Sequence, residues 1–147
     1  MVYIACDHGG LDLKRAVIQK LEGEGEKVTD LGTDSLDSVD YPDYGIAVAE
    51  RVAKEQGARG IVICKTGVGM SICANKVKGI RCGLCFTPEM GKLCREHNNA
   101  NVLALGAGNT DIETALKIVD AFLKTEFAGG RHEKRVGKII SYEENNG

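Results

Sequence analysis

Short runs rich in apolar and β-branched residues alternate along the chain with longer segments in which apolar residues recur every three or four positions. The short runs lie at 2–6, 27–31, 61–64, 80–86 and 101–105, and they are typical of strands in a buried parallel sheet. The periodic segments, expected to be amphipathic helices, lie at 11–21, 43–53, 70–76, 88–97 and 110–123. Strands that alternate with helices from end to end predict a doubly wound α/β fold with a five-stranded parallel sheet.

Local signals place the ends of several helices. Asp43 is a suitable N-cap for the second helix, and Thr110 with Glu113 forms a capping box before the last one. The residues from 127 onward form a short, charged tail. No linker, repeat or low-complexity tract interrupts the chain, so we expect a single domain that spans 1–147.

In doubly wound sheets, ligands bind beyond the carboxyl ends of the strands, at the point where the strand order reverses. Polar residues that directly follow the short runs are therefore the first candidates for a site. Asp7 and His8 follow the first run, and a carboxylate beside an imidazole can hydrogen-bond a polyol or an anionic group. The alternative is that Asp7 caps the next helix while His8 lies in solvent.

The third run leads into residues 64–69, CKTGVG, in which a thiol is followed by a glycine-spaced turn. The glycines allow the backbone to turn sharply, so the N–H groups of the turn and of the next helix converge. Such a turn favours a thiolate or a bound oxyanion, and simple burial of Cys64 is the alternative. The turn matches neither a dinucleotide fingerprint nor a Walker loop, because G-x-G-x-x-G and G-K-[ST] are both missing.

Two further sets of polar residues lie later in the chain. His97 occupies the apolar stripe of its predicted helix and precedes Asn98, so it is either a buried structural residue or part of a site at the helix end. Arg131 and Arg135 are four residues apart, and on a helix they would share one face and grip a phosphate from two sides. The alternative for these arginines is ordinary solvation of a charged helix start.

Composition narrows the classes of function. The 19 Lys+Arg against 21 Asp+Glu give a net charge of -2 and Trp is absent, which argues against a nucleic-acid partner. No run approaches the roughly 20 apolar residues that span a bilayer, so we expect no membrane partner and a cytoplasmic location. The six cysteines are expected to be reduced. Cys82 and Cys85 would face opposite sides of a strand, which argues against joint metal binding.

Together these residues resemble one family, the type B ribose-5-phosphate isomerases, which also embraces the galactose-6-phosphate isomerase subunits. The resemblance covers essentially the whole chain and is carried by Asp7-His8, Asp40-Tyr41-Pro42, Cys64-x-Thr66-Gly67-Val68-Gly69, Ala74-Asn75-Lys76, Gly79-Ile80-Arg81, His97-Asn98 and Gly129-Gly130-Arg131-His132-x-x-Arg135. It implies a five-stranded Rossmann-like (flavodoxin-like) sandwich. It also implies a homodimer, or a tetramer built from two dimers, in which subunits share each active site and the tail at about 127–147 packs on the partner.

The resemblance implies a chemistry as well: ribose 5-phosphate and ribulose 5-phosphate interconvert through a cis-enediolate, with no metal and no cofactor. Cys64 would be the base, Thr66 would support it, and His97 would help to open the sugar ring. The N–H groups that hold the enediolate would be those of Lys65, Thr66, Gly67, Val68 and Gly69. The residues that bind the sugar and its phosphate would be Asp7, His8, Tyr41, Asn98, Arg131 and Arg135.

The chain departs from this family pattern at two positions. Lys65 stands where members usually have glycine, and Gly108 stands where many have an arginine that contributes to phosphate binding. Our hypothesis is that Lys65 partly replaces that arginine or favours the Cys64 thiolate. An unchanged Michaelis constant and an unchanged thiolate titration in Lys65→Gly would refute it. The alternative is that Lys65 points into solvent and that the substrate is another sugar phosphate, such as allose 6-phosphate, galactose 6-phosphate or a tetrose phosphate. A sugar-phosphate-binding subunit without activity is a further alternative.

Overall fold

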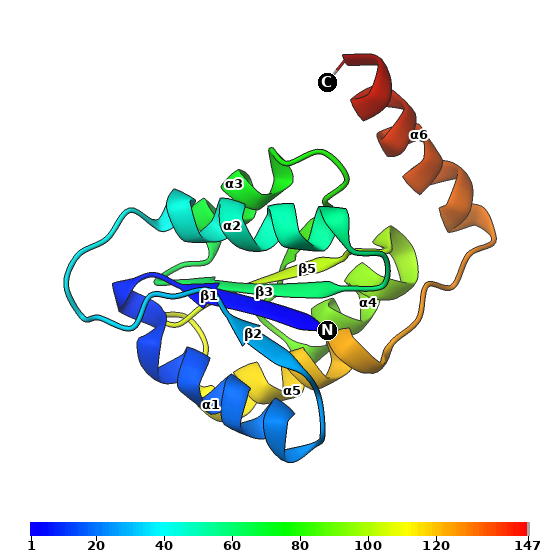
Figure 1. Ribbon diagram of the computed structural model, residues 1–147. Coiled ribbons are helices and arrows are strands. Elements are labelled where there is room, and N and C mark those ends of the chain that lie inside the picture. Colours follow the sequence, from blue (N-terminus) through cyan, green and yellow to red (C-terminus); the bar gives the residue numbers. More distant parts are fainter. Residues whose placement is uncertain (147) are drawn as a thin grey trace.

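The computed structural model describes residues 1–146, in which a parallel sheet lies between two layers of helices (Figure 1). The five strands are arranged in the order β2-β1-β3-β5-β4, and every neighbouring pair is parallel. They span Val2–Cys6 (β1), Val28–Asp30 (β2), Arg59–Cys64 (β3), Cys82–Leu84 (β4) and Val102–Gly106 (β5). The five-stranded parallel sheet predicted from the sequence is confirmed.

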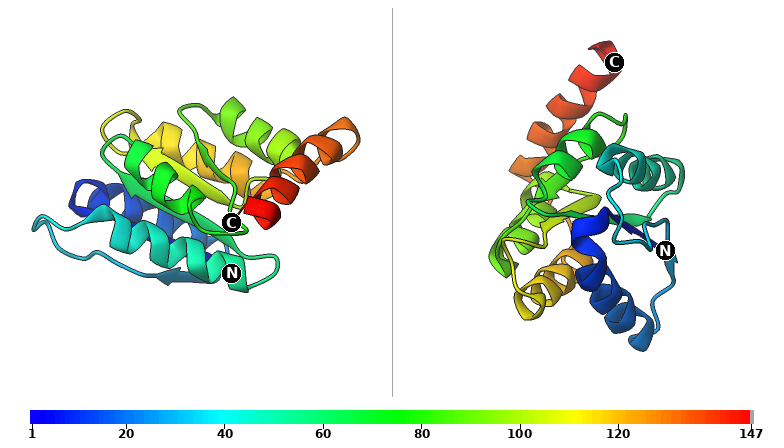
Figure 2. Two further views of the ribbon diagram at one scale, coloured as in Figure 1. Left: turned by 90° about the horizontal axis from the view of Figure 1, so that it is seen from above. Right: turned by 90° about the vertical axis from the view of Figure 1, so that its left-hand side faces the viewer.

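Helices cover both faces of the sheet, as the rotated views in Figure 2 show. α2 and α3 lie on one face, while α1, α4 and α5 lie on the other. A 3-10 turn, η1, joins β1 to α1, and α6 ends the described chain. The bounds are His8–Gly10 (η1), Leu11–Gly23 (α1), Tyr41–Lys54 (α2), Val68–Asn75 (α3), Pro88–Asn98 (α4), Ile112–Lys124 (α5) and Arg131–Asn146 (α6).

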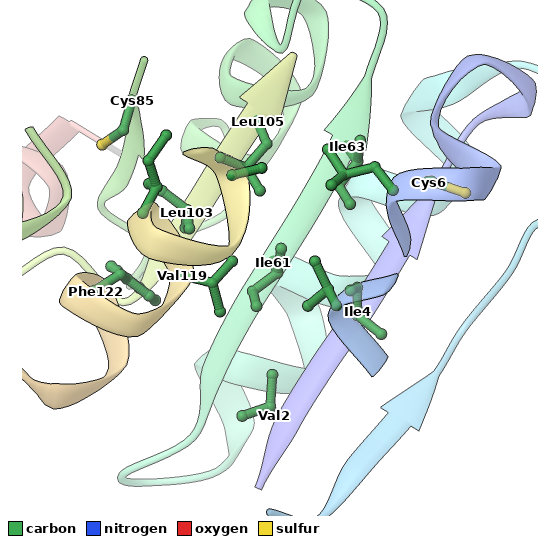
Figure 3. Close-up of a cluster of buried hydrophobic side chains, with 14 of the residues drawn as sticks. Val2, Ile4, Cys6, Ile61, Ile63, Cys85, Leu103, Leu105, Val119 and Phe122 are labelled. Carbon is green, nitrogen blue, oxygen red and sulfur yellow. The ribbon is translucent and has the colours of Figure 1, made fainter. Parts of the chain in front are cut away.

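Successive side chains along each strand face opposite layers of helices. Ile61 and Ile63 point toward α1 and α5, where they join the larger of the two buried clusters (Figure 3). Val62 and Cys64 point toward α2 and α3 and belong to the other cluster. This alternation places the thiol of Cys64 under the start of α3, on the face that carries the glycine turn.

The cysteines follow the same alternation, and all six are free. Cys82 packs against the cluster under α2 and α3, while Cys85 belongs to the cluster under α1 and α5. The Sγ atom of Cys85 lies 3.9 Å from that of Cys94. The expectation that Cys82 and Cys85 face opposite sides of their strand is therefore confirmed.

The predicted start of α2 is wrong by three residues. The helix begins at Tyr41, and its N-cap is Asp40, whose side chain makes no capping hydrogen bond. Pro42 lies in the first turn, where its missing N–H costs nothing because that N–H has no helical partner. Asp43, expected as the N-cap, lies in the first turn too, where its negative charge favours the positive end of the helix dipole.

The capping box predicted before α5 is also wrong, by one residue. Asp111 is the N-cap, and its Oδ1 accepts a hydrogen bond of 2.7 Å from the N–H of Thr114. The hydroxyl of Thr110 is instead buried without a hydrogen-bond partner among the described residues. By contrast, α4 has a side-chain cap at the residue directly before it, because Thr87 accepts a hydrogen bond from the N–H of Met90.

The remaining differences lie at the edges of the fold. The edge strands β2 and β4 are shorter than the predicted runs at 27–31 and 80–86, since each pairs on one side only. Residues 131–146, which the sequence analysis treated as part of a charged tail, form the helix α6. Val136 is its one buried side chain, and the helix projects away from the body of the molecule (Figure 1).

Candidate active site

A pocket of about 400 Å³ opens at the carboxyl ends of β1 and β3, where the strand order reverses. This is the place at which doubly wound sheets bind ligands. Its lining residues are Asp7, Tyr41, Cys64, Lys65, Thr66, Val68, Gly69 and Ile72. All but Ile72 were candidates from the sequence. Position directly after a strand or at the start of a helix was the informative signal for most of them, whereas Tyr41 was a candidate through the family resemblance alone.

The thiol of Cys64 lies at the base of this pocket and is 6% exposed. Its Sγ accepts a hydrogen bond of 3.2 Å from the N–H of Gly67. Gly67 has a φ of 79°, and a Cβ there would lie 2.5 Å from a side-chain carbon of Leu84. Glycine is therefore required to bring this N–H within hydrogen-bond distance of the sulfur.

The turn after Cys64 continues directly into the first turn of α3. The Oγ1 of Thr66 accepts a hydrogen bond of 3.2 Å from the N–H of Val68, which fixes the turn. The first N–H groups of a helix have no partner within it, and here they begin beside the thiol. The arrangement offers hydrogen-bond donors to negative charge that develops next to Cys64.

Tyr41 and Asp7 form the walls of the pocket on either side. The ring of Tyr41 packs on Gly69, where a Cβ would lie 2.5 Å from Cε1 and 3.0 Å from the hydroxyl oxygen. Asp7 is 8% exposed, and its Oδ1 accepts a hydrogen bond of 2.9 Å from the N–H of Gly9. That bond leaves its other carboxylate oxygen available to a ligand hydroxyl.

His8 lies next to the pocket but not in its lining. Its Nδ1 accepts a hydrogen bond of 3.2 Å from the N–H of Val39, so in the neutral ring Nε2 carries the proton and is a donor. Val39 belongs to the long loop before α2, and no motif in that loop predicts that it orients His8. His8 instead lines a neighbouring hollow of about 420 Å³, together with Gly9, Ala107 and Thr110.

The other predicted site residues lie at the opposite edge of the sheet. α4 starts after the carboxyl end of β4 and returns toward the amino ends of the strands, where His97 and Asn98 close it. Asn101, three residues after Asn98, accepts a hydrogen bond of 2.9 Å at its carbonyl oxygen from the N–H of Gly60, near the start of β3. Cys64 is four residues further along β3, which corresponds to about 13 Å.

Arg131 and Arg135 belong to the same edge, because the start of α6 packs against the end of α4. The rings of His97 and His132 are stacked, with centroids 4.3 Å apart and an interplanar angle of 17°. Partial burial, and then the positive charge of His97, Arg131 and Arg135, lowers the pKa of His132 below its ordinary value. At neutral pH His132 is therefore uncharged. The stack holds the two arginines near His97, a contact that the sequence analysis did not predict.

Within residues 1–146 the predicted site residues thus form two separate groups. Asp7, Tyr41 and residues 64–69 meet at the carboxyl edge, with His8 beside them. His97, Asn98, Arg131 and Arg135 do not line that pocket. Within residues 1–146, no group of three or more His, Cys, Asp or Glu side chains is arranged to hold a metal ion. In the same part of the chain, no helix has the length and apolar character needed to cross a membrane.

Comparison with known proteins connects this geometry to a family. The family model for ribose/galactose isomerases matches residues 2–139. The ribose-5-phosphate isomerase B of Escherichia coli is 44% identical over 143 residues, which cover 97% of this chain and 96% of that protein. A putative sugar phosphate isomerase of Bacillus subtilis is 47% identical over 146 residues, which cover 99% and 98%.

Solved structures give the same result. The ribose-5-phosphate isomerase B of Clostridium thermocellum has a TM-score of 0.96 and 51% sequence identity, and the match covers 99% of both chains. The enzyme from Mycoplasma genitalium, solved with bound ribulose 5-phosphate, has a TM-score of 0.96 and 44% identity over 99% of this chain and 97% of that one. The likeness therefore extends over the whole fold.

Proposed function

The chain belongs to the ribose/galactose isomerase family and is an aldose–ketose isomerase, and we propose that it interconverts ribose 5-phosphate and ribulose 5-phosphate. The observation that carries this proposal is the pocket in which the thiol of Cys64 accepts a hydrogen bond from the glycine turn. The ribulose 5-phosphate bound in the related structure indicates the substrate class.

In this proposal the thiolate of Cys64 is the base. It removes the proton from C2 of the open-chain aldose and returns it to C1, while a proton moves between the two oxygens and the carbonyl passes from C1 to C2. A proton α to a carbonyl is weakly acidic, so the negative charge of the enediolate needs donors that are already in place. The N–H groups from Lys65 to Gly69 would supply them, those of Gly67 and Val68 in exchange for the bonds that they donate to Cys64 and Thr66.

Other residues would bind and open the sugar. Asp7 and Tyr41 line the pocket and face the sugar hydroxyls. His97 would assist ring opening, with Asn98 beside it on the substrate. His8, Arg131 and Arg135 would bind the phosphate, which suits a bidentate guanidinium.

This distribution of roles requires a second copy of the chain. His97 and Arg131 lie at the far edge of the sheet from Cys64, so one chain alone cannot bring them to the same sugar. We propose a homodimer, alone or paired into a tetramer, in which each pocket is completed by His97, Asn98 and the arginines of the partner. Ile72 at the pocket and Tyr142 on α6 are 56% and 71% exposed, as expected for side chains that a partner covers. The segment at about 127–147 would pack on that partner.

Six free cysteines fit a reducing compartment, and we place the enzyme in the cytoplasm.

Turnover of ribose 5-phosphate by the wild type and by Cys64→Ala tests the proposal. A general base contributes about 100-fold to 10,000-fold, so we expect kcat to fall by at least that lower factor in the variant. Cys73→Ala is the matched control, because Cys73 lies in the same buried cluster but does not line the pocket. Undiminished activity of Cys64→Ala would refute the assignment of the base. Wild-type protein that prefers a four- or six-carbon sugar phosphate would refute the assignment of the substrate.

A further inference from the structure

Lys65 is the one lysine or arginine among residues 1–146 that lines the pocket around Cys64. Its side chain is exposed and forms no salt bridge with any acidic group in that part of the chain. This ammonium group has no carboxylate partner, so its charge is available to an anionic substrate that enters the pocket. The neighbours of the side chain show where the charge lies.

The side chain of Lys65 lies along the loops that follow β1 and β5. A Cβ on Gly108 would be 3.1 Å from Cγ of Lys65 and 3.7 Å from its Cε, and a Cβ on Gly9 would be 3.8 Å from its Cβ. The N–H of Gly108 also donates a hydrogen bond of 2.8 Å to the carbonyl oxygen of Lys65. Gly108 thus leaves room for the aliphatic part of the lysine, and the ammonium is one bond beyond Cε, close to the loop after β5.

The first part of the Lys65 side chain faces the turn that carries His8. Gly9, whose Cβ position would be 3.8 Å from the Cβ of Lys65, follows His8 in η1, and the Nδ1 of His8 accepts a hydrogen bond from Val39. The neighbouring hollow of about 420 Å³ has His8, Gly9 and Thr110 in its lining. The hydroxyl of Thr110 is buried there without a hydrogen-bond partner in the described chain. The imidazole of His8 lines this hollow and the ammonium of Lys65 belongs to the adjoining pocket around Cys64, and both groups suit a phosphate oxygen.

We propose that Lys65 is the phosphate-binding cation that the chain supplies to its own pocket, acting beside His8 from the opposite side to the partner's arginines. The inference rests on the proposed function, because it assumes that a sugar phosphate binds with its reacting carbons at Cys64. Lys65 then holds the phosphate end of the substrate, and Gly108 allows it to do so. The charge contributes to the binding of phosphorylated sugars and not to the proton transfer itself.

Lys65→Met tests this role, since methionine keeps most of the aliphatic length over Gly108 and removes the charge. We expect the KM for ribose 5-phosphate to rise about 10-fold or more, as for the loss of a hydrogen bond to a charged group, while kcat changes by less than about 2-fold. The inhibition constant of inorganic phosphate should rise by a similar factor. Lys65→Arg should restore most of the binding. Lys54→Met, which removes an exposed lysine at the far end of α2, should leave both constants unchanged.

A second variant separates loss of charge from misfolding. Gly108→Ala keeps the charge but places a methyl group 3.1 Å from both the Cγ and the carbonyl oxygen of Lys65, so the side chain moves and the loop after β5 shifts slightly. We expect a smaller rise in KM and an unchanged circular dichroism spectrum.

Two results would overturn the inference. The first is a KM and a phosphate inhibition constant in Lys65→Met that equal those of the wild type. The second is a fall in kcat, with a shifted pH profile and an unchanged KM, which would place the charge at the thiolate or the enediolate. Failure of the proposed function would look different, because the wild type itself would then not convert ribose 5-phosphate. Inhibition of its preferred reaction by inorganic phosphate would still test Lys65.

Discussion

Subunit complementation should restore activity to a mixture of two inactive variants, because the structure separates Cys64 from His97. In a dimer with shared sites, each site combines the carboxyl edge of one chain with the amino edge of the other. A heterodimer of Cys64→Ala and His97→Ala therefore has one site with both defects and one site with none. Random reassociation of equal amounts gives half heterodimers, each with one intact site of two, so about one quarter of the wild-type activity should return.

The assay is to unfold and refold the two variants together and to measure turnover of ribose 5-phosphate against the same variants refolded separately. A mixture of Cys64→Ala with Asp7→Asn is the matched control, since both changes affect the carboxyl edge and both sites of the heterodimer are then defective. Activity that stays at the level of the separate variants in the first mixture, with heterodimers shown to be present, would refute the shared site. Equal recovery in both mixtures would refute the division by sheet edges.

Three further predictions concern the scaffold. Gly67→Ala should lower the free energy of unfolding by about 2 kcal/mol and also reduce kcat. The φ of 79° is unfavourable for alanine, and the new Cβ would lie 3.0 Å from the backbone of β5. Urea unfolding measures the first effect and steady-state kinetics the second. Lys14 is 1% exposed and donates a hydrogen bond of 2.8 Å to Asp30. Lys14→Met should therefore lower the free energy of unfolding, measured in urea, by about 1 to 3 kcal/mol. Lys20→Met, at an exposed ion pair, should lower it by less than about 0.5 kcal/mol. Burial raises the pKa of the Cys6 thiol from 9.0 to about 11. The unfolded thiol then ionises first as the pH rises, so the free energy of unfolding should fall between about pH 9 and pH 11, by on the order of 2 kcal/mol, and more gently in Cys6→Ala.

Much of the fold could be predicted because it depends on local patterns. The first strand has the predicted bounds, Val2–Cys6, and five helices lie close to the predicted segments. Helix ends were less predictable, since Asp40 and Asp43 are both acceptable caps by residue type and the choice depends on where the preceding loop delivers the chain. α6 was missed because its sequence is polar and charged, and just one of its side chains packs on the body of the molecule.

The candidate site was predictable to the same extent. Asp7 and residues 64–69 were found because they follow a strand or begin a helix, and topology brings those positions together, whereas Tyr41 was found through the family resemblance. The relation of His97 to Cys64 was different, since each lies in the last turn or residue of its own element, yet one chain holds them at opposite edges of the sheet. The contact of Lys65 with Gly108 was also beyond local reasoning, because it depends on β3 and β5 being neighbours in the sheet.

In the proposed homodimer, α6 makes the number of complete active sites depend on the concentration of the protein. Its sixteen residues bury Val136 alone, and Ile139 and Tyr142 are 53% and 71% exposed. An isolated helix of about this length is marginal in water, so α6 gains its stability from whatever surface covers it. If a second copy of the chain provides that surface, folding of α6 and formation of the dimer become one equilibrium. Dilution would then release α6 and its arginines from the partner while the sheet stays folded. The turnover rate per chain would therefore fall at low protein concentration even when the sugar phosphate is saturating.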